Sequence, residues 1–201
     1  MFEITEYIGI IAFAMSGFFV GIRSKLDVLG VLISVFLTAF GSGVIRDVLV
    51  DETPYSFQHD MPLVIVVSIM ILLVLFRFHT KQNIENKPFF ILSDSIGLVS
   101  FSITGAMIGL EHGFNLMGVL SLAFITAVGG GISRDVIINE VPFVFKTGFY
   151  GTVALLVGLL IFVFHYFGFV GSYSMGFVFV LGVGLRLIAY YKDWTIPLKM
   201  L

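Results

Sequence analysis

The residues best suited to chemistry are two Arg-Asp pairs, each of which follows a glycine cluster inside a long apolar run. The first copy reads Gly41-Ser42-Gly43-Val44-Ile45-Arg46-Asp47, and the second reads Gly129-Gly130-Gly131-Ile132-Ser133-Arg134-Asp135. A charge within a membrane costs about 2.5–3.5 kcal/mol on the insertion scale, so such residues usually face the interior of a helix bundle. Glycine loosens a helix, and freed backbone groups are tolerated in a bilayer only within protein or beside water. The motifs therefore indicate a polar path through a membrane.

The composition places these motifs in an α-helical integral membrane protein. Of the 201 residues, 58% are hydrophobic and 12% are charged, and a soluble domain carries about twice that share of charge. The mean hydropathy is +1.07, and apolar stretches long enough to span a bilayer recur. A β-barrel would need short alternating segments, which these continuous runs exclude. The net charge of −2 gives no indication of nucleic-acid binding, and the lack of cysteine excludes disulfides and thiolate chemistry.

We predict seven membrane spans from the apolar runs. They lie at about 4–22, 28–50, 61–80, 89–110, 116–138, 146–168 and 171–191. The longest polar stretch, 81–88, separates two halves. The predicted organisation is a first three-helix repeat at 1–80, a second, inverted repeat at 89–168, and a seventh helix with a tail at 169–201.

The basic residues predict the orientation of the chain. If successive connections are assigned to alternate sides, nine of the eleven lysines and arginines, Arg186 among them, fall on one side. The other two are Arg46 and Arg134. The positive-inside rule therefore places the N-terminus outside and the C-terminus in the cytoplasm. The N-terminal residues show no basic region typical of a cleaved signal, so we expect the first span to direct insertion.

The two halves align without a gap when the chain is shifted by 88 residues. The shift pairs identical residues at positions spread along both halves, including Gly9 with Gly97, Phe13 with Phe101, Gly17 with Gly105, Arg46 with Arg134, Asp47 with Asp135, Glu52 with Glu140, and Pro54 with Pro142. A unit of three spans is odd, so the second copy must enter from the opposite face. The repeat therefore predicts inverted topology about an axis in the membrane plane.

Each motif allows two interpretations. The glycines at 41–43 and 129–131 could kink or unwind the helix and expose backbone groups to a pore, or could only permit close helix packing. Adjacent residues on a helix point about 100° apart, so we expect that neither Arg-Asp pair closes on itself. The charges would then face a pore or gate it, or form ion pairs that hold the repeats together.

Further polar residues follow helical spacing in the predicted spans. The small residues of the first and fourth spans are expected to pack helices together. For four hydroxyl residues a polar pore lining is an equal alternative: Ser16, Thr38, Thr104 and Thr126. Glu6 and Asp94 fall near opposite membrane faces, where each would be a carboxylate at a pore mouth or a solvated helix end.

The paired motifs, each with a downstream acid and proline, resemble those of the prokaryotic branch of the TRIC family, the trimeric intracellular cation channels. These sequences are also grouped under a glycine-transporter domain. The resemblance covers nearly the whole chain and implies a homotrimer with a pore in each protomer, bends at 41–43 and 129–131, and a lining from spans one, two, four and five. Two features depart from the family. Ser42 replaces a glycine, and Ile45-Arg46-Asp47 and Ser133-Arg134-Asp135 do not match the basic residues that hold an inositol lipid in the animal branch.

The leading hypothesis is a channel for K⁺ or Na⁺ in the inner or plasma membrane of a bacterium or archaeon. Its predicted partners are copies of itself, membrane lipids and monovalent cations, and it would need no cofactor or metal beyond the permeant ion. The alternative is a secondary transporter of a small zwitterion such as glycine, because inverted repeats with broken helices also suit alternating access. An enzyme is not expected, because no nucleophile–base constellation is present.

Overall fold

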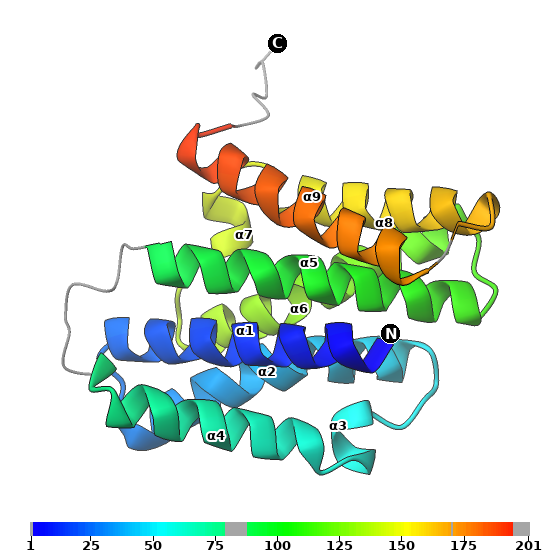
Figure 1. Ribbon diagram of the computed structural model, residues 1–201. Helices are drawn as coiled ribbons and strands as arrows, with labels where there is room; N and C mark the ends of the chain where they lie inside the picture. The colour runs from blue at the N-terminus through cyan, green and yellow to red at the C-terminus, as the bar shows by residue number, and fades with distance from the viewer. Residues whose placement is uncertain (1, 79–87, 170, 195–201) are drawn as a thin grey trace.

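The computed structural model describes residues 2–78, 88–169 and 171–194, and over these ranges the regular structure is helical throughout (Figure 1). The helices are α1 (Phe2–Arg23), α2 (Val28–Leu49), α3 (Tyr55–Gln58), α4 (Met61–Leu75), α5 (Pro88–Glu111), α6 (Leu116–Ile137), α7 (Phe143–Lys146), α8 (Tyr150–Tyr166) and α9 (Ser172–Tyr191). Five of them, α1, α2, α5, α6 and α9, are long and apolar enough to cross a membrane, and α4 and α8 are shorter apolar helices.

Each of the seven predicted spans overlaps one of these seven apolar helices, but the short helices α3 and α7 were not predicted. The predicted sixth span began at 146, whereas α8 begins at Tyr150. The helix cannot extend backward because Phe149 has a φ of 59°, in the left-handed region. The predicted third span ended at 80, but α4 ends at Leu75, and Arg77 has a φ of 55° in the left-handed region. Residues 79 and 80 lie outside the described ranges.

The second helix of each half begins at the same kind of cap. The Asp27 side chain accepts a hydrogen bond from the Gly30 N–H at 2.7 Å, and Asn115 accepts one from the Gly118 N–H at 3.0 Å. An acceptor at this position satisfies an amide that the first turn leaves without a partner. The two caps are 88 residues apart, so the same local signal starts α2 and α6.

Close packing between the first two helices of each half also recurs. A β-carbon on Gly17 would lie 2.7 Å from both the Ser34 carbonyl oxygen and the Thr38 hydroxyl. A β-carbon on Gly105 would lie 2.7 Å from the equivalent atoms of Leu122 and Thr126. Only glycine permits this approach, which confirms the packing role predicted for these small residues.

Equivalent residues meet at the centre of the molecule. Helices α1 and α5 lie side by side and run in opposite directions (Figure 1), and the ring centroids of Phe13 and Phe101 are 5.1 Å apart. Where α2 meets α6, the Gly130 N–H donates to the Ser42 hydroxyl at 2.9 Å. Both contacts join residues separated by 88 positions. Residues at equivalent positions of the two halves therefore lie side by side here, and α1, α2, α5 and α6 surround this centre.

The remaining apolar helices lie outside this central group. Helix α4 packs against α1, and α8 and α9 pack on the opposite side against α5 and α6 (Figure 1). Helix α4 has many exposed apolar side chains, among them Leu63, Val67 and Ile71. Such a surface suits contact with lipid or with other apolar helices rather than with water.

Candidate functional site

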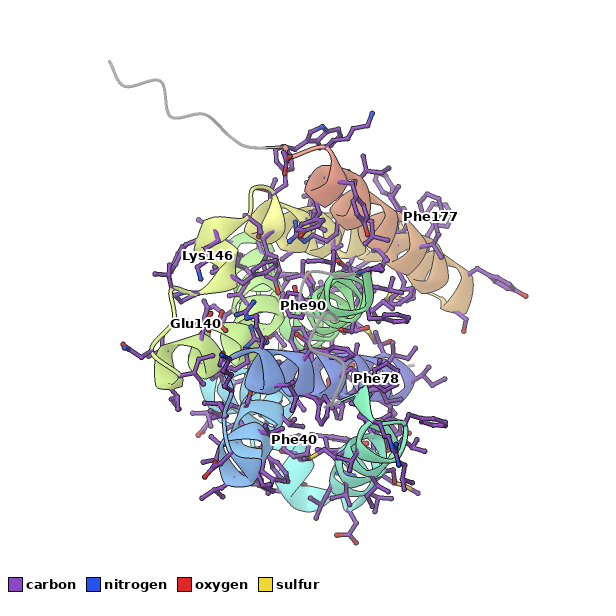
Figure 2. All side chains as sticks on the ribbon, turned by 90° about the vertical axis from the view of Figure 1, so that its left-hand side faces the viewer. Phe40, Phe78, Phe90, Glu140, Lys146 and Phe177 are labelled. Carbon is purple, nitrogen blue, oxygen red and sulfur yellow. The ribbon has the colours of Figure 1, made fainter. Side chains whose placement is uncertain are left out.

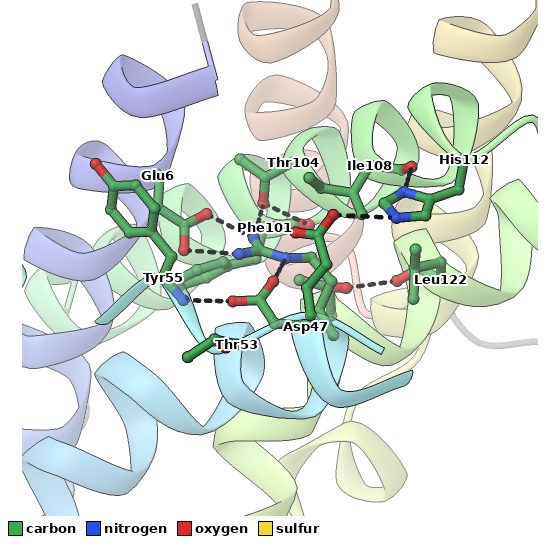
Figure 3. Close-up of polar contacts among 12 residues, drawn as sticks. Glu6, Asp47, Thr53, Tyr55, Phe101, Thr104, Ile108, His112 and Leu122 are labelled. Atoms are coloured by element: carbon green, nitrogen blue, oxygen red, sulfur yellow. Dashed lines mark hydrogen bonds and ion pairs between the residues drawn. The ribbon is translucent and has the colours of Figure 1, made fainter. Parts of the chain in front are cut away.

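Arg46 is the centre of a buried polar group that also contains Glu6, Asp47 and Thr104, which we name the first arginine cluster. The Arg46 Nη1 atom lies 2.7 Å from Glu6 Oε2 and donates to the Thr104 hydroxyl at 3.2 Å. The Nε atom donates to Asp47 Oδ1 at 2.7 Å (Figure 3). Every member is at most 4% exposed. Desolvation of such charges is costly, so each depends strongly on its partners.

The second arginine cluster contains the equivalent residues Arg134, Asp135 and Asp94, together with Ser16. Arg134 Nε donates to Asp135 Oδ1 at 2.8 Å, and Nη1 donates to the Ser16 hydroxyl at 3.2 Å. Ser16 in turn donates to Asp94 Oδ1 at 3.2 Å. Among the described residues, no ion pair within 4 Å joins Arg134 to Asp94. Aspartate is one methylene shorter than glutamate, and the serine bridges the remaining distance.

Each cluster takes its hydroxyl from the opposite half. Thr104 lies on α5 and serves Arg46, whereas Ser16 lies on α1 and serves Arg134. The polar groups therefore join the halves across the centre.

The prediction that an Arg-Asp pair cannot close on itself is wrong. The Arg46–Asp47 and Arg134–Asp135 pairs both form direct ion pairs. The arginine side chain is long enough for its Nε to turn toward the next carboxylate. Each aspartate also uses its second oxygen, because Asp47 Oδ2 accepts from the Tyr55 N–H and Asp135 Oδ2 from the Phe143 N–H, both at 2.8 Å.

The aspartate and the proline of each motif therefore have a common structural explanation. Pro54 and Pro142 precede the one-turn helices α3 and α7, whose first N–H groups are bound by the aspartates. In this way the aspartate fixes both the arginine and the turn that follows the helix. The sequence signal for this arrangement was the constant distance between aspartate and proline in the two copies.

The predicted unwinding at the glycines is also wrong, because α2 and α6 are continuous through 41–43 and 129–131. The close-packing alternative holds at the centre, where a β-carbon on Gly130 would collide with the Thr38 carbonyl oxygen. Ser42, the departure from the family pattern, uses its hydroxyl to accept the Gly130 N–H. A bend without unwinding remains a prediction for both helices.

Glu6 and Asp94 are not solvated helix ends, because they are only 3% and 2% exposed. The Phe2 ring lies beside the first cluster, with its centroid 5.1 Å from the Arg46 guanidinium carbon. The four predicted hydroxyl residues are fully buried as well. Thr38 and Thr126 each donate to a carbonyl one turn earlier at 2.6 Å. None of these four side chains is accessible to water, so a polar path along them is closed in this conformation.

Two contacts that the sequence did not predict join the helix ends crosswise. Glu140, after α6, bonds Arg23 at 2.7 Å and Ser24 at 2.8 Å at the end of α1. Figure 2 shows Glu140 and Lys146 on the same side of the molecule, with Lys146 Nζ 3.8 Å from Glu140 Oε2. Partial burial raises the pKa of Glu140, but the Ser24 hydrogen bond and the Arg23 charge outweigh this effect and hold the pKa below its usual value.

The equivalent contact at the other end pairs a glutamate with a histidine instead of an arginine. Glu52, after α2, lies 3.1 Å from Nε2 of His112 at the end of α5 (Figure 3). The His112 side chain is 27% exposed, and its Nδ1 also lies 2.9 Å from the Ile108 carbonyl oxygen.

Arg186 corrects the predicted distribution of basic residues, because it does not lie in a connection. It lies within α9 and is fully buried. Its Nη1 donates to the Gly148 carbonyl oxygen at 3.3 Å, and its Nη2 donates to the Thr147 hydroxyl at 3.2 Å. A position near a predicted cytoplasmic helix end gave no signal of this burial.

The fold and these clusters define a multi-pass helical membrane protein with two equivalent polar centres joined across its middle. The chain belongs to the family described as glycine transporter, whose profile matches residues 3–80 and 91–166. Together with the solved structures that resemble it, this match places the chain in the TRIC family, as the paired motifs indicated.

Individual relatives match over almost their whole length. The UPF0126 membrane protein YvgT of Bacillus subtilis is 34% identical over 196 residues, which cover 97% of this chain and 95% of that protein. A chain from structural work on conductance through TRIC cation channels is 32% identical with a TM-score of 0.84, covering 100% of this chain and 98% of that one. A prokaryotic TRIC channel crystallised in 0.5 M KCl is 30% identical with a TM-score of 0.86, covering 97% and 98%.

Proposed function

We propose that this protein is a monovalent-cation channel, with a pore through each protomer between α1, α2, α5 and α6. The observation that carries this proposal is the pair of buried arginine clusters that adjoin the contact of Ser42 with Gly130. Full-length similarity to TRIC cation channels supports it. The proposal includes a homotrimer, K⁺ or Na⁺ as the permeant ion, an N-terminus outside, and inverted repeats at 1–80 and 89–168 followed by the seventh helix.

The charge balance of the clusters favours cations over anions. In the first cluster two carboxylates, those of Glu6 and Asp47, pair with one guanidinium. Counting each side chain at its ordinary charge, the polar path between the halves carries an excess of negative charge close to Arg46. Rings of carboxylates are a common means of selecting cations in pores.

Conduction requires the closed path to open. The Arg46–Glu6 ion pair joins α2 to α1 at 2.7 Å, so a displacement of α2 relative to α1 would separate these charges and admit water. The two clusters would act as constrictions, and Ser16, Thr38, Thr104 and Thr126 would line the space between them.

A flux assay on one preparation tests the proposal. The purified protein is reconstituted into liposomes, and the fluxes of K⁺, Na⁺, Cl⁻ and glycine are compared with those of empty liposomes. We expect uncoupled cation flux without Cl⁻ or glycine flux. Saturable glycine uptake that shows counterflow, without cation flux, would overturn the channel and favour a transporter.

A further inference from the structure

Arg186 belongs to α9, the apolar helix that follows the two halves and has no counterpart in the 88-residue alignment. Its guanidinium carbon lies 4.7 Å from the centroid of the Tyr150 ring, a distance that suits a cation–π contact. Its hydrogen bonds go to Gly148 and Thr147, which are neutral, and its buried Nε has no hydrogen-bond partner in the described part of the chain. A buried guanidinium is expensive without a nearby negative charge.

Asp94 supplies that negative charge. Helices α5 and α9 run in opposite directions (Figure 1), and Gly182 of α9 packs against Val99 of α5, so Arg186 and Asp94 both lie about one turn from this contact toward the same end. The Asp94 Oδ2 atom is buried and has no hydrogen-bond partner in the described part of the chain, and Arg134 reaches this carboxylate only through the Ser16 hydroxyl. Tyr150 is buried as well, and its ring lies against Arg186. Helix α9 therefore adds a positive charge to the second arginine cluster.

The first arginine cluster has no equivalent addition among the described residues. Glu6 is bound directly by Arg46, and the loop position equivalent to Gly148 is Asp60, an acidic residue. The first cluster thus holds two carboxylates and one guanidinium, whereas the second, with Arg186, holds two of each. The two clusters occupy equivalent positions, but their net charges differ by one unit.

We propose that Arg186 is the counter-cation of Asp94, and that it makes cation current through the protein larger in one direction than in the other. A cation that crosses the path meets a negative cluster on one side of the centre and a neutral cluster on the other. Such a difference in the energy profile along a pore produces rectification. This inference rests on the proposed channel function.

Single-channel recording in planar bilayers with equal KCl on both sides tests the inference. The measured quantity is the ratio of the larger to the smaller unitary current at equal and opposite voltages. Arg186→Gln removes the positive charge and gives the two clusters the same net charge. We therefore expect the current ratio to decrease by about twofold or more and to approach unity. The double variant Asp94→Asn with Arg186→Gln restores neutrality, and its ratio should return to that of the unmodified protein.

Two controls separate charge from structure. Arg186→Lys keeps the charge and should keep the ratio, whereas Lys192→Gln removes an exposed charge near the same helix end and should leave the ratio unchanged. If Arg186→Gln does not fold, Asp94→Asn alone leaves an excess positive charge and should raise the ratio. An unchanged ratio in folded Arg186→Gln, or no recovery in the double variant, would overturn the inference alone. No cation current from the unmodified protein would overturn the channel proposal itself.

Discussion

The first and second arginine clusters occupy equivalent places but are held together differently. In the first, Glu6 forms a direct ion pair with Arg46 at 2.7 Å. In the second, a serine stands between Asp94 and Arg134, and we propose Arg186 of α9 as a further cation for the same carboxylate. The difference originates in one methylene group. In this chain the repeat therefore keeps the position of each charge but not the partner of that charge. The first cluster is the one held by a direct ion pair between its arginine and the distant carboxylate.

Replacing the central arginines should give the largest loss of stability, and the size of this loss should differ between the two clusters. Arg46→Met leaves Glu6 and Asp47 buried without their cation, and removal of one member of a buried pair costs about 3–5 kcal/mol. Arg134→Met should cost less, because Asp94 retains Ser16 and Arg186. Thermal unfolding of both variants in the same detergent measures the difference. Equal losses would contradict the claim that the first cluster is the tighter one.

Adding a methyl group at the centre should be the next largest perturbation. In Gly130→Ala the new β-carbon collides with the Thr38 carbonyl oxygen, and overpacking of this kind costs about 1–3 kcal/mol. Gly131→Ala is the matched control, since its nearest neighbour would be Arg134 Nη2 at 3.9 Å, an ordinary contact. Thermal unfolding should show a loss for the first variant only. A stable Gly130→Ala protein would mean that the close contact of α2 with α6 is not required.

Glu6→Asp makes the first cluster resemble the second. The shortened carboxylate should lose direct contact with Arg46, which weakens a charge-assisted hydrogen bond worth about 1.5–3 kcal/mol. We expect lower thermal stability and faster K⁺ flux into liposomes, because the ion pair that closes the path is weakened. Asp94→Asn serves as the comparison in the other half. Slower flux in folded Glu6→Asp would show that the ion pair supports the open form.

The smallest expected effect concerns the contacts at the helix ends and depends on pH. The pKa of Glu140 is held below its ordinary value of 4.5, so its contribution to stability is present above that value and is lost as the pH falls through the lowered pKa. Glu140→Gln should therefore lose up to about 1 kcal/mol near neutral pH, because the pair is partly exposed.

The equivalent variant Glu52→Gln is the control for this contact. Its carboxylate is 52% exposed and faces His112 rather than an arginine, so we expect a smaller loss near neutral pH. When unfolding is measured from neutral to acidic pH, the stabilities of Glu140→Gln and of the unmodified protein should become equal at low pH. A constant difference at all pH values would show that Glu140 acts through packing and not through its charge.

Local patterns were sufficient to predict the apolar helices and their repetition. Hydropathy marks a span because the bilayer requires a fixed length of apolar chain, and the caps at Asp27 and Asn115 lie where the second span of each half was expected to begin. The importance of Arg46 and Arg134 was also predictable, since charges are rare within apolar runs. Each of these properties depends on residues that are close together in the chain.

Only the tertiary structure decided which groups these charges contact. Whether Arg46 reaches Glu6 depends on the distance between α1 and α2, and a difference as small as the length of one methylene group decides it. Hydropathy does not contain this information. Arg186 was counted among the basic residues of one membrane side, because its burial depends on the loop at 147–148 and on Tyr150, residues almost forty positions away. The sequence by itself therefore determined the helices, the 88-residue repeat and the residues under constraint. The partners of each charge, and the difference between the two halves, arise only when helices distant in the chain pack together.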